Sequence, residues 1–218
     1  MRLGFLLTSS LVFFASSYSA LAQPIAIGVE GGLRTTGDVS GTVTPESKRY
    51  IVGPKLEVRL PWHFSFEFDA LYRDVGFTGY AGSVFFSSIT RERDTSWEFP
   101  MIVKYRLPRA GWLHPFVGVG YAPRTLHGSA VASGQYVNAL TGVSTHYADN
   151  RVSTNYAVTQ GVVASGGVEF GARHALISPE VRFVHWNAAA INDYGGDGSF
   201  QWSSPQDELF VLVGIAWH

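Results

Sequence analysis

The chain has 218 residues, a formal net charge of −1, no cysteine, and 14% aromatic against 15% charged residues. This length fits one large domain or at most two small ones. The balanced charge argues against a nucleic-acid-binding surface, and the absence of cysteine excludes a disulfide framework. Abundant glycine and aromatic residues favour an all-β protein.

The first 22 residues have the layout of a secretory signal peptide. A positive charge at Arg2 precedes the apolar run LGFLLTSSLVFFA, and Ala20-Leu21-Ala22 places small residues at positions −3 and −1 before Gln23. These three parts are typical of a signal that is cleaved on export. We therefore expect a signal peptide at 1–22, one β-barrel domain at 23–218, and no lipid anchor, because no cysteine follows the cleavage site.

Beyond this segment, apolar and polar residues alternate as they do in strands with two unlike faces. We predict eight strands, at 25–36, 50–60, 63–78, 93–107, 114–126, 158–173, 176–187 and 208–217. Short and long connections alternate between them, and the long ones are 37–49, 79–92, 127–157 and 188–207. Short periplasmic turns, long extracellular loops and an even strand number predict an antiparallel up-and-down transmembrane β-barrel of the outer-membrane type.

Three prolines conflict with this assignment. Pro54, Pro100 and Pro179 fall inside predicted strands. Proline cannot donate a ladder hydrogen bond, and a closed barrel has no free edge to accommodate that loss. We therefore expect bulges or strand ends at these positions.

Each predicted strand separates into an apolar and a charged phase. In the second strand, Val52, Leu56 and Val58 alternate with Lys55 and Glu57. A soluble carrier of the lipocalin type would turn the apolar phase inward. However, the interior of an eight-stranded barrel is just wide enough for side chains to fill, and the apolar phase is rich in Phe, Tyr and Trp. We therefore expect this phase to face lipid and the charged phase to fill the lumen.

The charged phase predicts a network of ion pairs that closes the lumen, because buried charges persist only when they are paired. Its expected members are Glu30, Arg34, Lys55, Glu57, Arg59, Glu67, Asp69, Arg73, Glu98, Lys104, Arg106, Glu169, Arg173, Glu180 and Arg182. Eight of these residues are positive and seven are negative. A lumen filled in this way leaves little room for an aqueous pore.

Tryptophans near strand ends indicate the two membrane interfaces, where aromatic side chains collect. Trp62, Trp112 and Trp217 fall at predicted periplasmic ends, and Trp97 falls at a predicted outer end. The chain finishes on LFVLVGIAWH, with Trp217 next to the last residue. The alternation in this segment predicts a last strand that closes the barrel against the first.

Five segments carry a family resemblance: GPKLEVRLP, WEFPMIVKYRLP, PFVGVGYAPR, PEVRFVHW and ELFVLVGIAWH. Together they resemble the bacterial outer-membrane protein β-barrel domain family, one of the small eight-stranded barrels that include the OmpA transmembrane domain, OmpX and OmpW. The resemblance covers residues 24–218 and implies the fold and an outer-membrane location. The closing segment also resembles the C-terminal signature presented to the barrel-insertion machinery. Membrane lipid and that machinery are thus the expected partners.

Catalytic and metal-binding signals are weak. His185 in RFVHWNAAAIND resembles the His-x-Ser segment of PagL-type lipid A deacylases, but Asn187 stands where the nucleophilic serine is required. His63, His114 and His174 lie on three different turns without ligand spacing. We therefore expect no enzymatic activity, no metal and no cofactor.

The predicted outer loops offer the remaining candidates. NDYGGDG, at 192–198, lacks the bidentate Glu of a calcium loop. The longest loop, 127–157, carries three tyrosines and is either a binding loop or a hairpin that extends the strands. The leading hypothesis is a monomeric barrel with a structural or interaction role through its outer loops. The alternatives are a narrow channel for small or apolar solutes, as OmpW-like barrels suggest, and a lipid-modifying enzyme.

Overall fold

In this computed structural model, the described residues are 25–37, 40–41, 43–108, 112–156, 158–172, 175–189, 192–194 and 201–217. All regular secondary structure among them is β. Within these ranges no helix is long and apolar enough to span a bilayer. The predicted signal peptide at 1–22 lies outside the described residues and stays a prediction.

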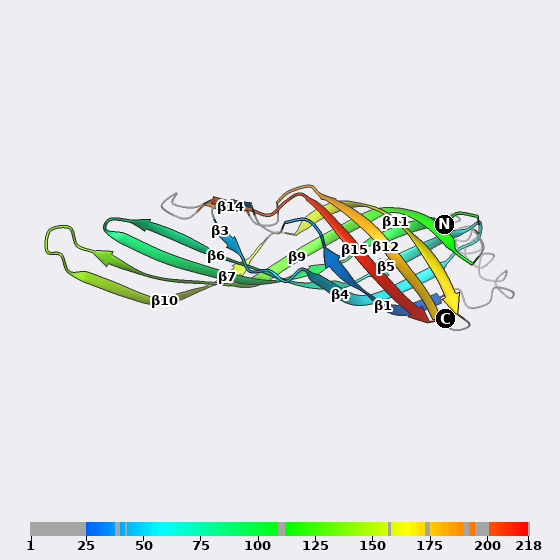
Figure 1. Cartoon of the computed structure of the whole chain (residues 1–218), viewed down its shortest axis with the longest axis horizontal. Helices are drawn as coiled ribbons and strands as arrows, with labels where there is room; N and C mark the ends of the chain where they lie inside the picture. The colour runs from blue at the N-terminus through cyan, green and yellow to red at the C-terminus, as the bar shows by residue number, and fades with distance from the viewer. Residues whose placement is uncertain are drawn as a thin grey trace, which may run out of the picture.

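Eight strands form the wall of the barrel, and two of them are interrupted once. In chain order they are β1 (Ile25–Arg34), β4 (Tyr50–Arg59), β5 (Phe64–Asp69) with β6 (Leu71–Ser83), β7 (Phe86–Glu98) with β8 (Met101–Arg106), β9 (His114–Val137), β11 (Thr159–Ala172), β12 (Ala175–Trp186) and β15 (Asp207–Trp217). Neighbours pair antiparallel in this order, and β15 pairs with β1, which closes the sheet (Figure 1). The predicted fold class, an all-β eight-stranded antiparallel up-and-down barrel, is confirmed.

Four strands continue beyond the barrel as two long hairpins, on the left of Figure 1. β6 pairs with β7 as far as Ser83↔Phe86, and β9 pairs with β10 (Ser144–Asn155) as far as Val137↔Ser144. Because β7 also pairs with β9 as far as Phe86↔Tyr136, the hairpins form one continuous sheet. We call this part the outer sheet. The expectation of a loop at 79–92 is therefore wrong, and in 127–157 the strands extend as a hairpin.

Four short strands lie beside the outer sheet. β3 (Val43–Pro45) pairs with β6, and β2 (Ser40–Gly41), β13 (Asn192–Tyr194) and β14 (Gln201–Ser203) form a separate small sheet. At the opposite end of the barrel the connections are short. Residues 60–63 join β4 to β5, 107–113 join β8 to β9, and 173–174 join β11 to β12.

None of the three strand prolines shifts the register. Pro54 keeps its place in β4, where its carbonyl accepts a hydrogen bond from the Ala70 amide at 3.1 Å. Pro179 stays paired with Val213 of β15, while the ladder to β11 lacks pairs at this level. The bulges or strand ends expected at Pro54 and Pro179 are therefore absent, whereas Pro100 does lie between two strands, β7 and β8. The barrel accommodates each missing donor locally and keeps its pairing.

Burial alternates residue by residue along the wall strands. In β12, Glu180 and Arg182 are buried, whereas Val181 and Phe183 are 48% and 41% exposed. The same alternation occurs in β4 and β15. The core of the protein is therefore the lumen, which is largely charged, and the surface of the wall is apolar.

Candidate functional site

An apolar belt surrounds the barrel. Its members are at least one-third exposed and include Ile27, Val29, Leu33, Val52, Leu56, Phe64, Phe66, Phe68, Val103, Tyr105, Val117, Val119, Tyr121, Val162, Ile177, Val181, Phe183, Val211, Val213 and Ile215. Soluble monomers rarely expose a contiguous apolar patch larger than a few hundred Å². A belt on every wall strand is suited to a hydrocarbon surrounding.

The height of this belt matches a membrane. Outward-facing side chains run from Trp97 to Leu107 along β7 and β8, which is ten residue steps. At about 3.3 Å per residue and a tilt of about 40°, this stretch rises roughly 25 Å. Outer-membrane barrels carry an apolar band of about that height.

The four predicted interface tryptophans lie at the two ends of the belt. Trp62, Trp112 and Trp217 are at the end with the short connections and are 85%, 72% and 54% exposed. Trp62 lies in the 60–63 turn with a left-handed backbone angle (φ 61°). At the other end, Trp97 stacks on Phe99 with ring centroids 6.4 Å apart.

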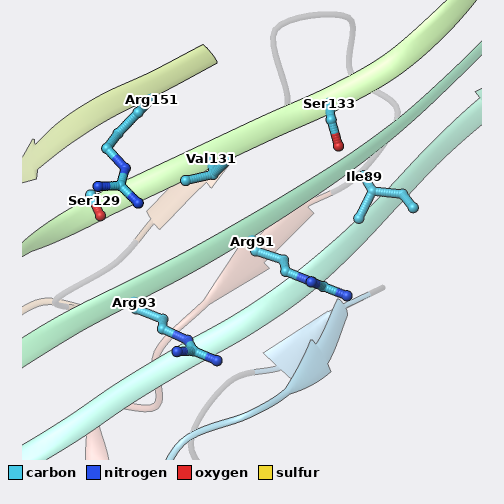
Figure 2. Close-up of a pocket in the computed structure, with 7 residues that line it drawn as sticks. All are labelled: Ile89, Arg91, Arg93, Ser129, Val131, Ser133 and Arg151. Atoms are coloured by element: carbon cyan, nitrogen blue, oxygen red, sulfur yellow. The ribbon is translucent and has the colours of Figure 1, made fainter. Parts of the chain in front are cut away.

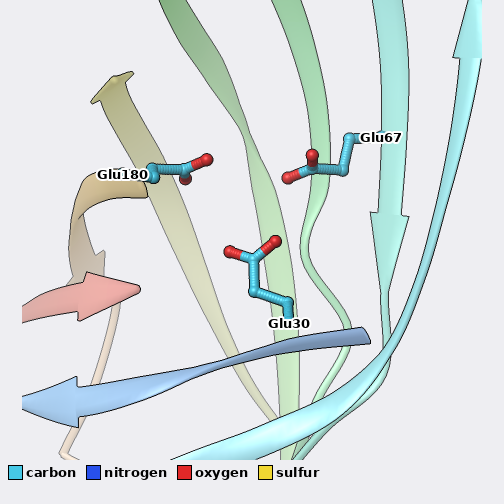
Figure 3. Close-up of side chains that lie close together, drawn as sticks. All are labelled: Glu30, Glu67 and Glu180. Carbon is cyan, nitrogen blue, oxygen red and sulfur yellow. The ribbon is translucent and has the colours of Figure 1, made fainter. Parts of the chain in front are cut away.

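Seven charged side chains form a central cluster inside the barrel. Three are cations and four are carboxylates: Lys55, Lys104, Arg182, Glu30, Glu67, Asp69 and Glu180. Figure 3 shows three of the carboxylates converging from β1, β5 and β12. Glu67 is the most shared, since its carboxylate lies 2.5 Å from Lys55 Nζ and 2.6 Å from Lys104 Nζ. These residues come from five strands, β1, β4, β5, β8 and β12, so the cluster links the wall across the lumen.

Arg182 joins all four carboxylates of the central cluster. Its Nη1 lies 2.8 Å from Asp69 Oδ2, and its Nε lies 2.8 Å from Glu180 Oε1. Its Nη2 lies 2.9 Å from both Glu30 Oε1 and Glu67 Oε1. The planar guanidinium suits this role, because it presents several fixed donors in one plane.

A second, outer cluster lies toward the outer sheet. Glu208 Oε1 is its centre, at 3.4 Å from Arg34 Nη1, 3.3 Å from Arg73 Nη2 and 3.2 Å from Arg124 Nη1. Arg73 Nη2 also lies 3.3 Å from Glu98 Oε1. Three cations here meet two carboxylates, whereas the central cluster has three cations and four carboxylates. The excess charges of the two clusters are therefore opposite in sign.

An apolar layer separates these two ionic clusters. It consists of the buried residues Ile51, Leu71, Ile102, Ala122, Val163, Val184, Trp186, Phe210 and Leu212. Trp186 is its largest member, is fully buried, and packs under the Arg124 guanidinium at 3.8 Å from the ring centroid. Such a layer opposes the passage of water and ions, because hydrophobic constrictions dewet.

A third ionic group lies toward the short connections. Arg106 Nε is 2.8 Å from Glu169 Oε2, and its Nη2 also donates to Glu57. Arg59 is half-buried and has no ion-pair partner among the residues that the structure describes. Arg173 lies outside them, so its predicted place in the network stays a prediction.

Two members of the outer cluster were not predicted. Arg124 lies in the middle of β9, and Glu208 is the second residue of β15. The signal for both is the alternation itself: Glu208 shares a phase with Phe210 and Leu212, and Arg124 shares one with Ala122.

The weaker candidates have structural explanations. His185 Nδ1 lies 2.7 Å from Asp207 Oδ1, and both side chains are more than half exposed. The side-chain oxygen of Asn187 accepts a hydrogen bond from the backbone N–H of Gln160 at 3.0 Å. Asn187 thus stands where the nucleophilic serine would be needed. His174 and most of the 192–198 loop lie outside the described residues.

Glu30, Glu67 and Glu180 have the mutual spacing of metal ligands, with one oxygen of each within 4.8 Å of the others. These carboxylates already bind Lys55, Lys104 and Arg182. The cations neutralise the charge that would attract a metal ion. The cluster is therefore explained as an ion-pair network.

No family model and no curated protein matches the chain. Among solved structures, it is similar to Neisserial surface protein A, with a TM-score of 0.46 and 7% identity over 91% of this chain and 99% of that chain. The outer membrane protease OmpT of Escherichia coli gives 0.44 and 11% identity over 91% and 99%. The N-terminal barrel of Pseudomonas aeruginosa OprF gives 0.37 and 11% over 88% and 96%. At these identities the likeness concerns the fold alone.

Proposed function

We propose that the protein is an integral outer-membrane β-barrel with a closed lumen, and that it acts as a structural or interaction protein through its outer sheet. The observation that carries this proposal is that polar and apolar side chains are placed the opposite way round from a soluble protein. Ionised side chains are buried inside the barrel, while an exposed apolar belt roughly 25 Å high surrounds it. Only a hydrocarbon solvent favours that arrangement.

The filling of the lumen supports a closed barrel. From one end to the other, the lumen contains the Arg106 group, the central cluster, the apolar layer and the outer cluster. Interiors of eight-stranded barrels are filled by side chains. A solute would have to break buried ion pairs and then cross the apolar layer, so a channel role is disfavoured.

The orientation follows from the connections. Short turns belong on the periplasmic side of outer-membrane barrels and long segments on the outside, so the outer sheet faces the surroundings of the cell. Membrane lipid and the insertion machinery are then the partners of the wall, and the barrel is a monomer. The geometry of His185 does not favour an enzymatic role, because His185 pairs with Asp207 and Asn187 stands where a nucleophilic serine would be needed.

The first experiment tests the membrane location. The mature chain should fractionate with the outer membrane, require detergent to stay monodisperse, and migrate faster on gels before boiling than after. A protein that stays monodisperse in plain buffer would be a soluble carrier, and the proposal would be wrong.

The second experiment tests the closed lumen. Purified protein inserted in a planar bilayer should give no steady conductance. A stable open current would instead support the narrow channel. The lipid-modifying alternative is checked by comparing the mass of lipid A from cells with and without the protein, where we expect no change.

A further inference from the structure

The outward face of the outer sheet carries three arginines around one groove. Arg91 and Arg93 lie on β7, and Arg151 lies on β10. Both Arg91 and Arg151 pair with Val131 of the intervening β9, and this places them on either side of it in one row. The groove has a volume of about 420 Å³ and is lined by Ile89, Arg91, Arg93, Ser129, Val131, Ser133 and Arg151 (Figure 2).

These arginines differ from those of the lumen, because no carboxylate pairs with them among the residues that the structure describes. The described residues that line the groove include no carboxylate. The two acidic residues interleaved with them on β7 and just beyond, Glu92 and Asp94, are buried on the opposite face. There they accept hydrogen bonds from the hydroxyls of Tyr156 and Thr154, respectively. Three positive charges therefore face outward together, and an anion is the ligand that compensates them.

The position of the groove indicates what kind of anion reaches it. Arg93 and Arg91 continue the outward phase of β7 four and six residues beyond Trp97, which marks the outer end of the apolar belt. At about 3.3 Å per residue and a tilt of about 40°, they lie roughly 10 and 15 Å beyond it. The groove thus opens sideways at the height of lipid headgroups, above the part of the wall that faces acyl chains.

The residue types specify the chemistry of the headgroup. Guanidinium groups bind phosphate bidentately, and serine hydroxyls add single hydrogen bonds. Across two strand spacings Arg91 and Arg151 are separated by roughly 10 Å, and Arg93 lies about 7 Å along β7. Side chains of this length can converge on one phosphate or hold two neighbouring ones.

A second groove continues from the first, farther from the belt. It has a volume of about 370 Å³ and shares Ile89 and Ser133 with the first. Its other lining residues are Ser87, Gly134, Gln135, His146 and Tyr147. The ring of Tyr147 stacks on Phe86 with centroids 6.5 Å apart, on the opposite face of the sheet, where Phe86 packs against the cluster around Phe77. The serine, glutamine and histidine side chains along this groove suit the hydroxyl groups of a saccharide.

We propose that this face binds the phosphorylated saccharide headgroup of a glycolipid in the surrounding leaflet. The acyl chains lie against the belt, the phosphates lie on Arg91, Arg93 and Arg151, and the sugars extend along the second groove. The inference rests on the proposed membrane location, because a groove at this height meets headgroups only if the belt is in a bilayer.

The test measures binding of purified protein, in a neutral detergent, to bisphosphorylated lipid A, to dephosphorylated lipid A and to inorganic phosphate. We expect the bisphosphorylated form to bind at least about tenfold more tightly than the dephosphorylated form, because charged hydrogen bonds are lost with the phosphates. Arg91→Gln with Arg151→Gln should remove that preference. Lys48→Gln with Arg49→Gln is the matched control, since it removes the same charge from exposed side chains outside the groove.

Each outcome has a defined meaning. Equal loss in both double variants would mean diffuse electrostatic attraction and would overturn the site. Competition by inorganic phosphate at the same concentration as lipid A would assign the groove to free phosphate instead. A detergent-dependent barrel that binds both forms of lipid A alike would overturn this site only, whereas a chain that needs no detergent would overturn the proposed function itself. Unchanged gel mobility before boiling shows that each variant is folded.

Discussion

At the scale of single residues, Arg182 is the side chain on which the central cluster depends most. Its guanidinium is buried and lies within 3 Å of four carboxylates. A buried ion pair contributes little compared with apolar packing of the same volume, but removing one partner leaves an uncompensated buried charge. Loss of Arg182 should therefore destabilise the fold mainly because its four carboxylates would stay buried without this cation.

We expect Arg182→Met to lower the free energy of unfolding by about 3–5 kcal/mol. Arg182→Lys should fall between this variant and the wild type, because one ammonium cannot reach four carboxylates in the geometry of a guanidinium. The measurement is urea unfolding in lipid vesicles, followed by tryptophan fluorescence. Arg49→Met, at an exposed site, should stay within about 0.5 kcal/mol of the wild type. If Arg182→Met matched that control, the central cluster would not depend on its arginine.

At the scale of elements, the seam between β1 and β15 depends on close backbone approach. A Cβ added at Gly28 would lie 2.0 Å from the carbonyl oxygen of Ile215, which only a backbone shift could relieve. At Gly31, whose side faces outward, the nearest atoms are 3.5 Å away, which is ordinary contact. On the same strand, Gly28 therefore has no room for a larger residue, whereas Gly31 does.

Gly28→Ala should impair closure of the barrel, with a loss of about 1–3 kcal/mol from overpacking, whereas Gly31→Ala should have almost no effect. The readout is the fraction of heat-modifiable protein after refolding into vesicles, together with urea unfolding of what folds. Equal refolding of the two variants would show that the seam can adjust its backbone at no measurable cost.

The outer sheet is expected to be separable from the barrel, because the lumen clusters and the apolar layer belong to the wall. Replacing residues 131–151 with Asn-Gly would join Ala130 to its partner Val152 through a favoured hairpin turn. We expect this variant to fold with stability within about 1 kcal/mol of the wild type and to lose the preference for phosphorylated lipid A. A deeper deletion, 127–156, removes the hydrogen-bond donors of Glu92 and Asp94 and should destabilise the protein clearly. Failure of the shorter deletion to fold would show that the hairpin is needed for assembly.

The wall strands were predictable from the sequence because one face of each points into the charged lumen and the other carries the apolar belt. Alternation fails where both faces are covered. Phe77 and Thr78 are consecutive and both buried, since Phe77 belongs to an apolar cluster with Val75 and Leu126 while Thr78 hydrogen-bonds to Glu46. The extension of β6 therefore carries no clear period of two. The extension of β7 does alternate in burial, but both of its faces carry polar residues, so its sequence resembles a loop.

The pairing of charges was not predictable in the same way. Whether a charged residue faces the lumen follows from its position in the alternation along the strand. Which residue it pairs with depends on the staggered register of the strands in the closed barrel. Glu208 binds Arg34 and Arg124, which are 174 and 84 residues away. Glu208 and Arg124 both fall inside predicted strands, so their place in the lumen could be predicted from the phase that they share with Phe210 and Ala122, whereas their partners could not.

At the scale of the whole molecule, the lumen is a stack in which ionic clusters alternate with apolar packing. The ionic clusters link strands across the lumen and thereby favour one strand register, whereas the apolar layer excludes water from the space between the central and outer clusters. An open path therefore requires loss of the apolar layer as well as rearrangement of charge. This arrangement fits the proposed role at the outer surface, because a closed lumen would preserve the permeability barrier of a membrane.

The apolar layer can be tested directly as the seal. Trp186 and Phe210 are its bulkiest members, and replacing both with Ala should leave a cavity between two charged clusters that water can fill. We expect this double variant to show transient conductance in planar bilayers where the wild type shows none. Phe183→Ala with Val211→Ala is the matched control, because these side chains lie on the same two strands but face outward, and it should stay silent. Gel mobility before boiling verifies folding, and Phe210→Ala alone serves if the pair does not fold. If the folded Trp186/Phe210 double variant showed no conductance, the ion pairs alone would be sufficient to close the lumen.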